Sequence, residues 1–256
     1  MAEIVRLGQG DPIVMVPGLA GGWKLLAPLA RSLARTHQVV LYDMRGDRDW
    51  IGSPSALDLG EYADDLAGVI EGTGLERPAV FGVSFGGAVA LEFALSHPGH
   101  VSSLILQGVE AQFERTIGSH IARWALERFP LPADSRFINQ FFNLLHGKKP
   151  QPGPLVDFIA ERIWKTDQSV IANRLALVEQ FDVSDRLWQL DLPTLVMAGS
   201  RDAIITPARQ RMLADSIAGS KFQAIEGAGH VGFLTHRKET AAAVRGFVRS
   251  LAHSSC

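Results

Sequence analysis

Short apolar runs alternate along the chain with longer segments whose apolar residues recur at helical spacing. Short apolar runs are typical of buried strands, and a spacing of three and four residues is typical of helices. This alternation predicts an α/β fold, a doubly wound and mostly parallel sheet with helices on both faces. The strands are expected at 3–7, 13–16, 38–42, 79–83, 101–106, 194–198 and 222–225, and the helices at about 25–33, 61–70, 88–95, 208–217 and 238–251.

The strand pattern is absent between the expected strands at 101–106 and 194–198. Apolar residues recur there at helical spacing instead, and prolines divide the stretch, because a proline inside a helix removes a donor and clashes with the preceding turn. Those prolines are Pro130, Pro132, Pro150, Pro152 and Pro154. We therefore predict a core domain made of residues 1–110 and 191–256, and a helical lid inserted at residues 111–190.

Composition narrows the class of protein. The 256 residues suit one α/β core with an insertion, and 46% apolar with 20% charged residues is typical of a chain that folds throughout. Lys and Arg total 25 against 27 Asp and Glu, so there is no basic excess for nucleic acid, and we expect no such partner. The single cysteine, Cys256, excludes an intrachain disulfide and suits a reducing compartment. No signal segment or membrane-length apolar run is evident, so we expect a cytoplasmic protein with no membrane partner.

The sequence Gly82-Val83-Ser84-Phe85-Gly86 lies where an apolar strand is expected to meet an alanine-rich helix. A Gly-x-Ser-x-Gly sequence in this context is typical of a nucleophile elbow, a sharp turn that exposes the serine hydroxyl. Small neighbours allow the strand and the helix to approach closely around the turn. As a bare pattern the motif is common in ordinary turns, but its place between strand and helix favours Ser84 as a nucleophile.

On these residues the chain resembles the α/β-hydrolase family from about Leu7 to Leu251, and its carboxylesterase and carbon–carbon bond hydrolase branches in particular. The resemblance implies a triad in the order serine, acid, histidine. It places the acid at Asp202, in the loop after the strand at 194–198, and the base at His230, within Gly227-Ala228-Gly229-His230. A serine hydroxyl needs such a base to take its proton, and the base needs a carboxylate to fix its tautomer.

Glu110, just after the strand at 101–106, is a competing acid, because some members of the family carry theirs at this point; Asp202 is preferred. The helix N-terminus after Ser84 predicts the backbone N–H of Phe85 as one oxyanion donor. The glycine-rich loop Pro17 to Gly22 predicts Leu19 as the other, although Pro17 replaces a histidine that is common in the family. We expect no cofactor and no metal, because the histidines lack metal-ligand spacing.

The expected function is hydrolysis of a small to medium neutral ester through an acyl-enzyme on Ser84. Hydrolysis of a carbon–carbon bond in a ring-cleavage dienoate, and a ligand receptor that keeps the triad but turns over slowly, stay open. A small-molecule substrate is the expected partner, and the sequence does not define the oligomeric state. We also expect the lid to form one wall of an apolar pocket over Ser84. Several of its large aromatic residues should face that cavity while the others pack the lid on the core, and these residues are Trp124, Phe129, Phe137, Phe141, Phe142, Phe158, Trp164, Phe181 and Trp188.

Overall fold

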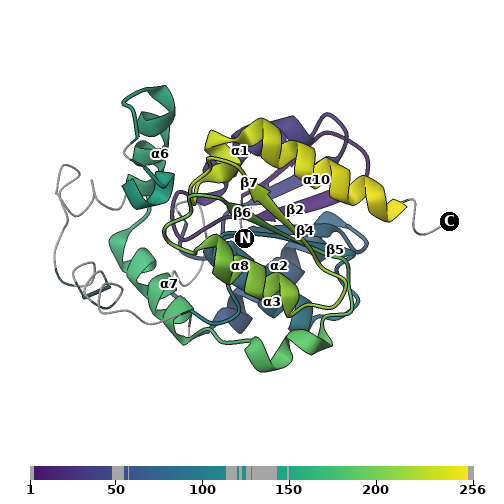
Figure 1. The fold of residues 1–256 in the computed structure, drawn as a ribbon. Coiled ribbons are helices and arrows are strands. Elements are labelled where there is room, and N and C mark those ends of the chain that lie inside the picture. Colours follow the sequence, from purple (N-terminus) through teal and green to yellow (C-terminus); the bar gives the residue numbers. More distant parts are fainter. Residues whose placement is uncertain are drawn as a thin grey trace.

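The structure is a computed structural model that describes residues 3–47, 55–56, 58–113, 120, 123–124, 128, 143–148 and 150–252. In this part of the chain seven strands form one sheet in the order β1-β3-β2-β4-β5-β6-β7 (Figure 1). The strands are β1 (Ile4–Leu7), β2 (Pro12–Val16), β3 (Gln38–Tyr42), β4 (Ala79–Val83), β5 (Ser103–Gln107), β6 (Thr194–Gly199) and β7 (Lys221–Ile225).

The sheet is parallel except at one edge. β1 runs antiparallel to β3, while β2, β3, β4, β5, β6 and β7 pair in parallel. The register aligns Ile13 with Ala79 and Ala79 with Ser103, so the carboxyl ends of β2, β4 and β5 meet at the same edge. In such a sheet the loops that leave this edge are the usual place for a ligand.

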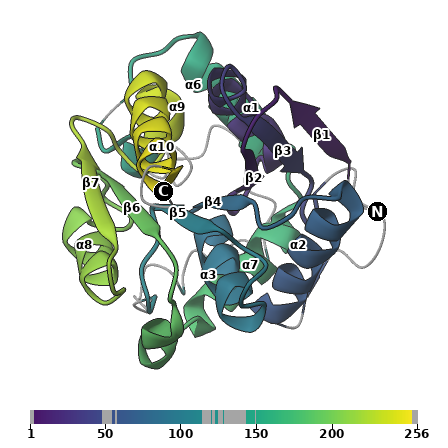
Figure 2. The ribbon, with the colours of Figure 1, turned by 90° about the vertical axis from the view of Figure 1, so that its right-hand side faces the viewer.

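Helices cover both faces of the sheet, so the predicted doubly wound α/β fold is confirmed. In Figure 2, α1 and α10 lie on one side of the strands, and α2 and α3 lie on the other, where α8 also packs. The helices of the core are α1 (Gly22–Leu33), α2 (Leu59–Thr73), α3 (Phe85–Ser96), α8 (Pro207–Asp215), α9 (Gly232–Thr235) and α10 (Arg237–Ala252).

Local sequence explains where several helices begin and end. The Asp58 side chain accepts a hydrogen bond from the Glu61 N–H and so caps α2, which ends at Gly74 in the left-handed conformation. Thr206 caps α8 in the same way, ahead of a proline in its first turn. The helix α3 is apolar on nearly all sides because it is buried between the sheet, α2 and η1 (Ser184–Gln189).

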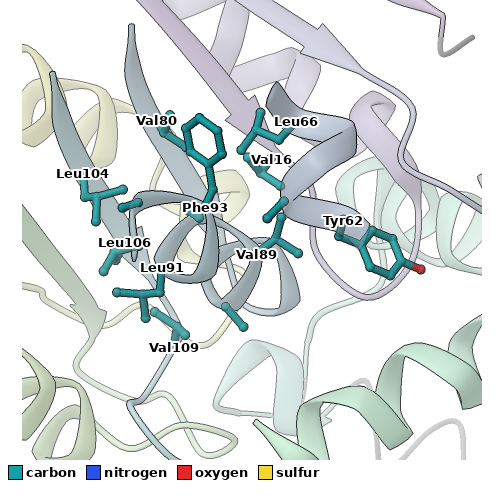
Figure 3. Packing of buried hydrophobic residues seen from close by; sticks show 14 of the residues in the cluster. Val16, Tyr62, Leu66, Val80, Val89, Leu91, Phe93, Leu104, Leu106 and Val109 are labelled. Carbon is teal, nitrogen blue, oxygen red and sulfur yellow. The ribbon is translucent and has the colours of Figure 1, made fainter. Parts of the chain in front are cut away.

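The larger hydrophobic cluster lies between β4, β5 and the helices α2 and α3 (Figure 3). Val80, Leu104 and Leu106 project from the strands toward Val89 and Phe93 of α3, and all five are fully buried. Burial of a side chain of this size contributes about 1.5–3 kcal/mol. This packing fixes the position of α3, and with it the turn that enters the helix.

In residues 111–190, the described part contains α6 (Pro154–Trp164), α7 (Gln168–Gln180) and the 3₁₀ helix η1. These helices agree with the helical spacing of the sequence, while the division into core and lid stays a prediction. α6 contacts α1, and α7 and η1 contact α3. Among the described residues of the whole chain, no helix has the length and apolar character to cross a membrane, and the expected cytoplasmic location stays a prediction.

Candidate active site

Ser84 occupies the turn between β4 and α3 in a backbone conformation that is rare for a residue with a side chain. Its φ is 53° and its ψ is −119°. The turn is held by backbone hydrogen bonds on both sides: the Ser84 N–H donates to the Gln107 carbonyl at 2.8 Å, and the Gly87 N–H donates to the Ser84 carbonyl at 2.7 Å. Strained backbone of this kind persists where the surrounding structure fixes it, often at active sites.

The glycines on each side of Ser84 are required by close packing. A Cβ on Gly82 would overlap the carbonyl oxygen of Gly86, and a Cβ on Gly86 would overlap the carbonyl oxygens of Val16 and Pro17. Both contacts are with backbone, which cannot move aside cheaply. The strand, the helix and the loop after β2 therefore meet around the serine, as the Gly-x-Ser-x-Gly motif predicts.

Asp202 and His230 are brought together from two different loops. The Nδ1 atom of His230 lies 2.9 Å from Oδ2 of Asp202, and both side chains are buried. Oδ1 of Asp202 accepts hydrogen bonds from the backbone N–H groups of Ile204 and Ile205, at 2.9 and 3.0 Å. These bonds fix the carboxylate, which in turn can hold a proton on Nδ1 and leave Nε2 of the imidazole as an acceptor.

The sequence did not identify two further residues that support this pair. The amide of Gln210 donates to Asp202 Oδ2 at 3.2 Å and to the Ile205 carbonyl at 2.7 Å, and its oxygen accepts from the Gly108 N–H at 2.8 Å. Gly108 has a φ of 69°, and a Cβ there would lie 2.8 Å from Cε1 of His230. A glycine directly after β5 was a visible signal, whereas nothing in the sequence marks Gln210.

A cavity of about 210 Å³ joins these residues. Ser84, Phe85, Leu19 and His230 all line it, and the other lining residues that the structure describes are apolar apart from Glu110. The loop that carries Leu19 lies against the serine, since a Cβ on Gly18 would be 3.8 Å from the Cβ of Ser84. Within the described part of the chain, neither the Leu19 nor the Phe85 N–H donates a backbone hydrogen bond.

The wall that residues 111–190 contribute to this cavity is more aliphatic than expected. Phe181 lines the cavity as predicted. Trp124 and Trp188 are 49% and 78% exposed, while Phe158 and Trp164 pack against the core cluster. Most of the other described lining residues from this segment are aliphatic; they are Phe113, Leu145, Ile163, Ile171, Leu175 and Val178. Phe129, Phe137, Phe141 and Phe142 lie outside the described residues.

Glu110 also lines the cavity, but its carboxylate forms an ion pair with Arg209 and not with His230. Its Oε2 lies 3.4 Å from Nη1 of Arg209, and its side chain is 8% exposed. Burial raises the pKa of Glu110 above the ordinary value, the nearby charge of Arg209 opposes that rise, and the charge of Asp202 adds to it. The carboxylate that contacts His230 Nδ1 is that of Asp202.

No group of three or more His, Cys, Asp or Glu side chains able to hold a metal ion occurs among the described residues. Of the cavity-lining residues that the structure describes, His230 and Glu110 carry titratable side chains.

Comparison with known proteins agrees with this architecture. A family model described as the alpha/beta hydrolase fold matches residues 11–237, and the chain belongs to this family. Polyketide synthase ThaQ of Burkholderia thailandensis is 30% identical over 96% of the chain, which spans only 12% of that protein's length. A pimeloyl-(acyl-carrier protein) methyl ester esterase of Neisseria meningitidis is 28% identical, over 93% of this chain and 94% of its own.

Solved structures show the same fold. A thermophilic esterase from Thermogutta terrifontis superimposes with a TM-score of 0.86 at 25% sequence identity. The match covers 97% of this chain and 93% of that chain. The family and these relatives support a hydrolase.

Proposed function

We propose that the chain is a serine hydrolase that cleaves a small to medium neutral ester through an acyl-enzyme on Ser84. The observation that carries the proposal is the contact of 2.9 Å between His230 Nδ1 and Asp202 Oδ2, at a cavity that Ser84 also lines. A buried carboxylate on Nδ1 leaves Nε2 free to take a proton from a serine hydroxyl. The ester chemistry in the names of the Neisseria and Thermogutta relatives supports the same reaction class.

The proposed reaction has two halves. Ser84 Oγ attacks the ester carbonyl carbon while His230 Nε2 takes the hydroxyl proton, and the carbonyl electron pair moves to oxygen. The N–H groups of Leu19 and Phe85 stabilise that oxyanion. The electron pair on the oxyanion then re-forms the carbonyl, the bond to the alkoxy oxygen breaks, and the alcohol leaves with the proton from His230. In the second half, water attacks the carbonyl carbon of the acyl-enzyme and gives a proton to His230 Nε2. The bond from the acyl group to Ser84 Oγ then breaks, Oγ takes the proton from His230, and the acid leaves.

The lining of the cavity favours a neutral substrate over a ring-cleavage dienoate. Among the described lining residues, Ser84, Glu110 and His230 are the polar ones, and no lysine or arginine is present. A dienoate carries a carboxylate, which would be buried next to Glu110 without a cation to pair with it, at a cost of several kcal/mol. The volume of about 210 Å³ is below the usual range for drug-sized ligands, which favours a small acyl group.

Turnover on p-nitrophenyl butyrate, with Ser84→Ala as the control, tests the proposal. We expect many cycles per protein molecule for the wild type and a loss of at least about 10³-fold in kcat for the variant. A burst of about one equivalent followed by arrest would favour a slow receptor. Activity of Ser84→Ala within tenfold of wild type would refute Ser84 as the nucleophile.

A further inference from the structure

A fully buried arginine in α7 touches the loop after β2 that would supply one oxyanion donor. Arg174 has no exposed surface. Its Nη1 donates to the Leu19 carbonyl at 3.0 Å, and its Nη2 donates to the Arg45 carbonyl at 2.7 Å and to Asp47 Oδ1 at 2.9 Å. A buried arginine is rare, because its charge must be compensated where it lies.

The same guanidinium also contacts the other proposed oxyanion residue. Its central carbon lies 5.6 Å from the ring centroid of Phe85 and 5.7 Å from that of Tyr62, within reach of a cation–π interaction. Nε of Arg174 donates to the Tyr62 hydroxyl at 3.3 Å. One side chain of α7 therefore contacts both residues that are proposed to supply the oxyanion donors: Leu19 through its carbonyl and Phe85 through its ring.

The partner of Arg174 supports the far end of the same loop. Asp47 is buried, and its Oδ2 accepts from the Met44 N–H at 3.0 Å. A Cβ on Gly22 would lie 3.4 Å from that Oδ2, so the loop ends against this carboxylate. In addition, the Gly21 N–H donates to Oγ1 of Thr166, between α6 and α7, at 2.8 Å. Contacts from α7, from the turn before it and from Asp47 thus fix the loop at three points.

From this geometry we infer that Arg174 is a positioning residue for the oxyanion hole, holding the Leu19 peptide and the Phe85 ring in the arrangement that the transition state needs. The inference rests on the proposed function. A carbonyl held at Leu19 limits rotation of the loop backbone that carries the Leu19 N–H. Loss of one oxyanion donor costs about 10²–10³-fold in kcat in a serine protease, and a displaced donor costs part of that.

The test must separate this role from simple attachment of α7 to the core. Arg174→Lys keeps a cation for Asp47, but one ammonium cannot also reach the Leu19 and Arg45 carbonyls in the guanidinium geometry. Arg174→Met combined with Asp47→Asn removes both buried charges and keeps an acceptor for the Met44 N–H. Removal of both members of a buried ion pair costs far less stability than removal of one.

The matched control is Arg186→Met. Arg186 forms an ion pair of 3.0 Å with Glu92 between η1 and α3, and it does not line the cavity. The substitution Arg186→Met therefore removes an arginine contact between η1 and α3 without affecting the loop after β2. Urea denaturation of each variant shows whether it is folded under the assay conditions.

For Arg174→Lys and for the double variant, we expect kcat on p-nitrophenyl butyrate to fall about tenfold to a hundredfold with KM nearly unchanged, because the lost interaction forms only in the transition state. The Ki of a trifluoromethyl ketone, which forms a tetrahedral adduct with the serine, should rise by the same factor. Arg186→Met should match the wild type in both. If both Arg174 variants are folded and stay within threefold of wild type in kcat and Ki, the inference is overturned. An inactive wild type would instead count against the proposed function.

Discussion

Replacing Asp202 by asparagine should reverse the tautomer of His230 while leaving the site nearly unchanged in shape. The backbone N–H groups of Ile204 and Ile205 can only donate, so they will keep the amide oxygen at the position of Oδ1. The amide nitrogen must then take the position of Oδ2, 2.9 Å from His230 Nδ1. An N–H donated to Nδ1 moves the ring proton to Nε2, where it blocks proton transfer from Ser84.

Gln210 cannot rotate to relieve this arrangement. Its amide nitrogen donates to the Ile205 carbonyl and its oxygen accepts from the Gly108 N–H, so a flip would lose both bonds. In Asp202→Asn, the amide N–H of the new side chain and the amide N–H of Gln210 will therefore face each other at the former position of Oδ2. This contact between two donors costs about 1–3 kcal/mol of stability. The wrong tautomer costs about 10⁴-fold in kcat in a serine protease, and we expect a similar loss here.

The assay is kcat on p-nitrophenyl butyrate together with urea denaturation for Asp202→Asn and Glu110→Gln. We expect Asp202→Asn to remain folded and to lose about four orders of magnitude in kcat, which is about 5.4 kcal/mol of transition-state stabilisation. Glu110→Gln should keep at least a tenth of the wild-type rate, because its carboxylate faces Arg209. A nearly silent Asp202→Asn with an inactive Glu110→Gln would show that the acid is Glu110.

Three further predictions concern the surroundings of the triad. Gly108→Ala should lower kcat at least about tenfold, because its Cβ would lie 2.8 Å from His230 Cε1 at a φ of 69°; an unchanged kcat would contradict it. Burial raises the pKa of Glu110, so its proton is held more tightly in the folded state, and this contribution to stability is lost as pH rises above the ordinary value of 4.5. The free energy of unfolding of Glu110→Gln, minus that of wild type, should therefore grow between pH 4.5 and neutrality in urea titrations, and a constant difference would refute the argument. Finally, kcat/KM for p-nitrophenyl esters should rise with acyl length, by up to about 0.8 kcal/mol of binding per CH₂, until the cavity is full; a flat series or a preference for charged acyl groups would refute the apolar wall.

Much of the fold could be predicted because the pattern that defines it is local. The expected strands at 38–42 and 79–83 coincide with β3 and β4, since short apolar runs bounded by turns leave little choice of ends. The motif around Ser84 was equally visible, because the glycines there are required by backbone contacts that only glycine permits. Asp202 and His230 needed the family resemblance, since 28 positions separate them in the chain.

Other parts of the site depend on tertiary contacts that leave no local pattern. Nothing near Arg174 shows that its side chain reaches loops more than a hundred residues away. The same holds for Gln210, which bonds to Gly108 across the sheet edge. The aromatic content of residues 111–190 was a poor guide to the cavity wall for a related reason: large side chains are conspicuous in a sequence, but Trp188 is exposed and the aliphatic Leu175 lines the cavity.

A nucleophilic Ser84 activated by His230 should react covalently with a fluorophosphonate probe. The experiment is to label the protein with such a probe and to map the modified peptide by mass spectrometry. We predict one adduct, on Ser84, with loss of esterase activity in proportion to labelling and at least about a hundredfold slower labelling in His230→Ala. An adduct on another serine, or full esterase activity after complete modification of Ser84, would contradict the account.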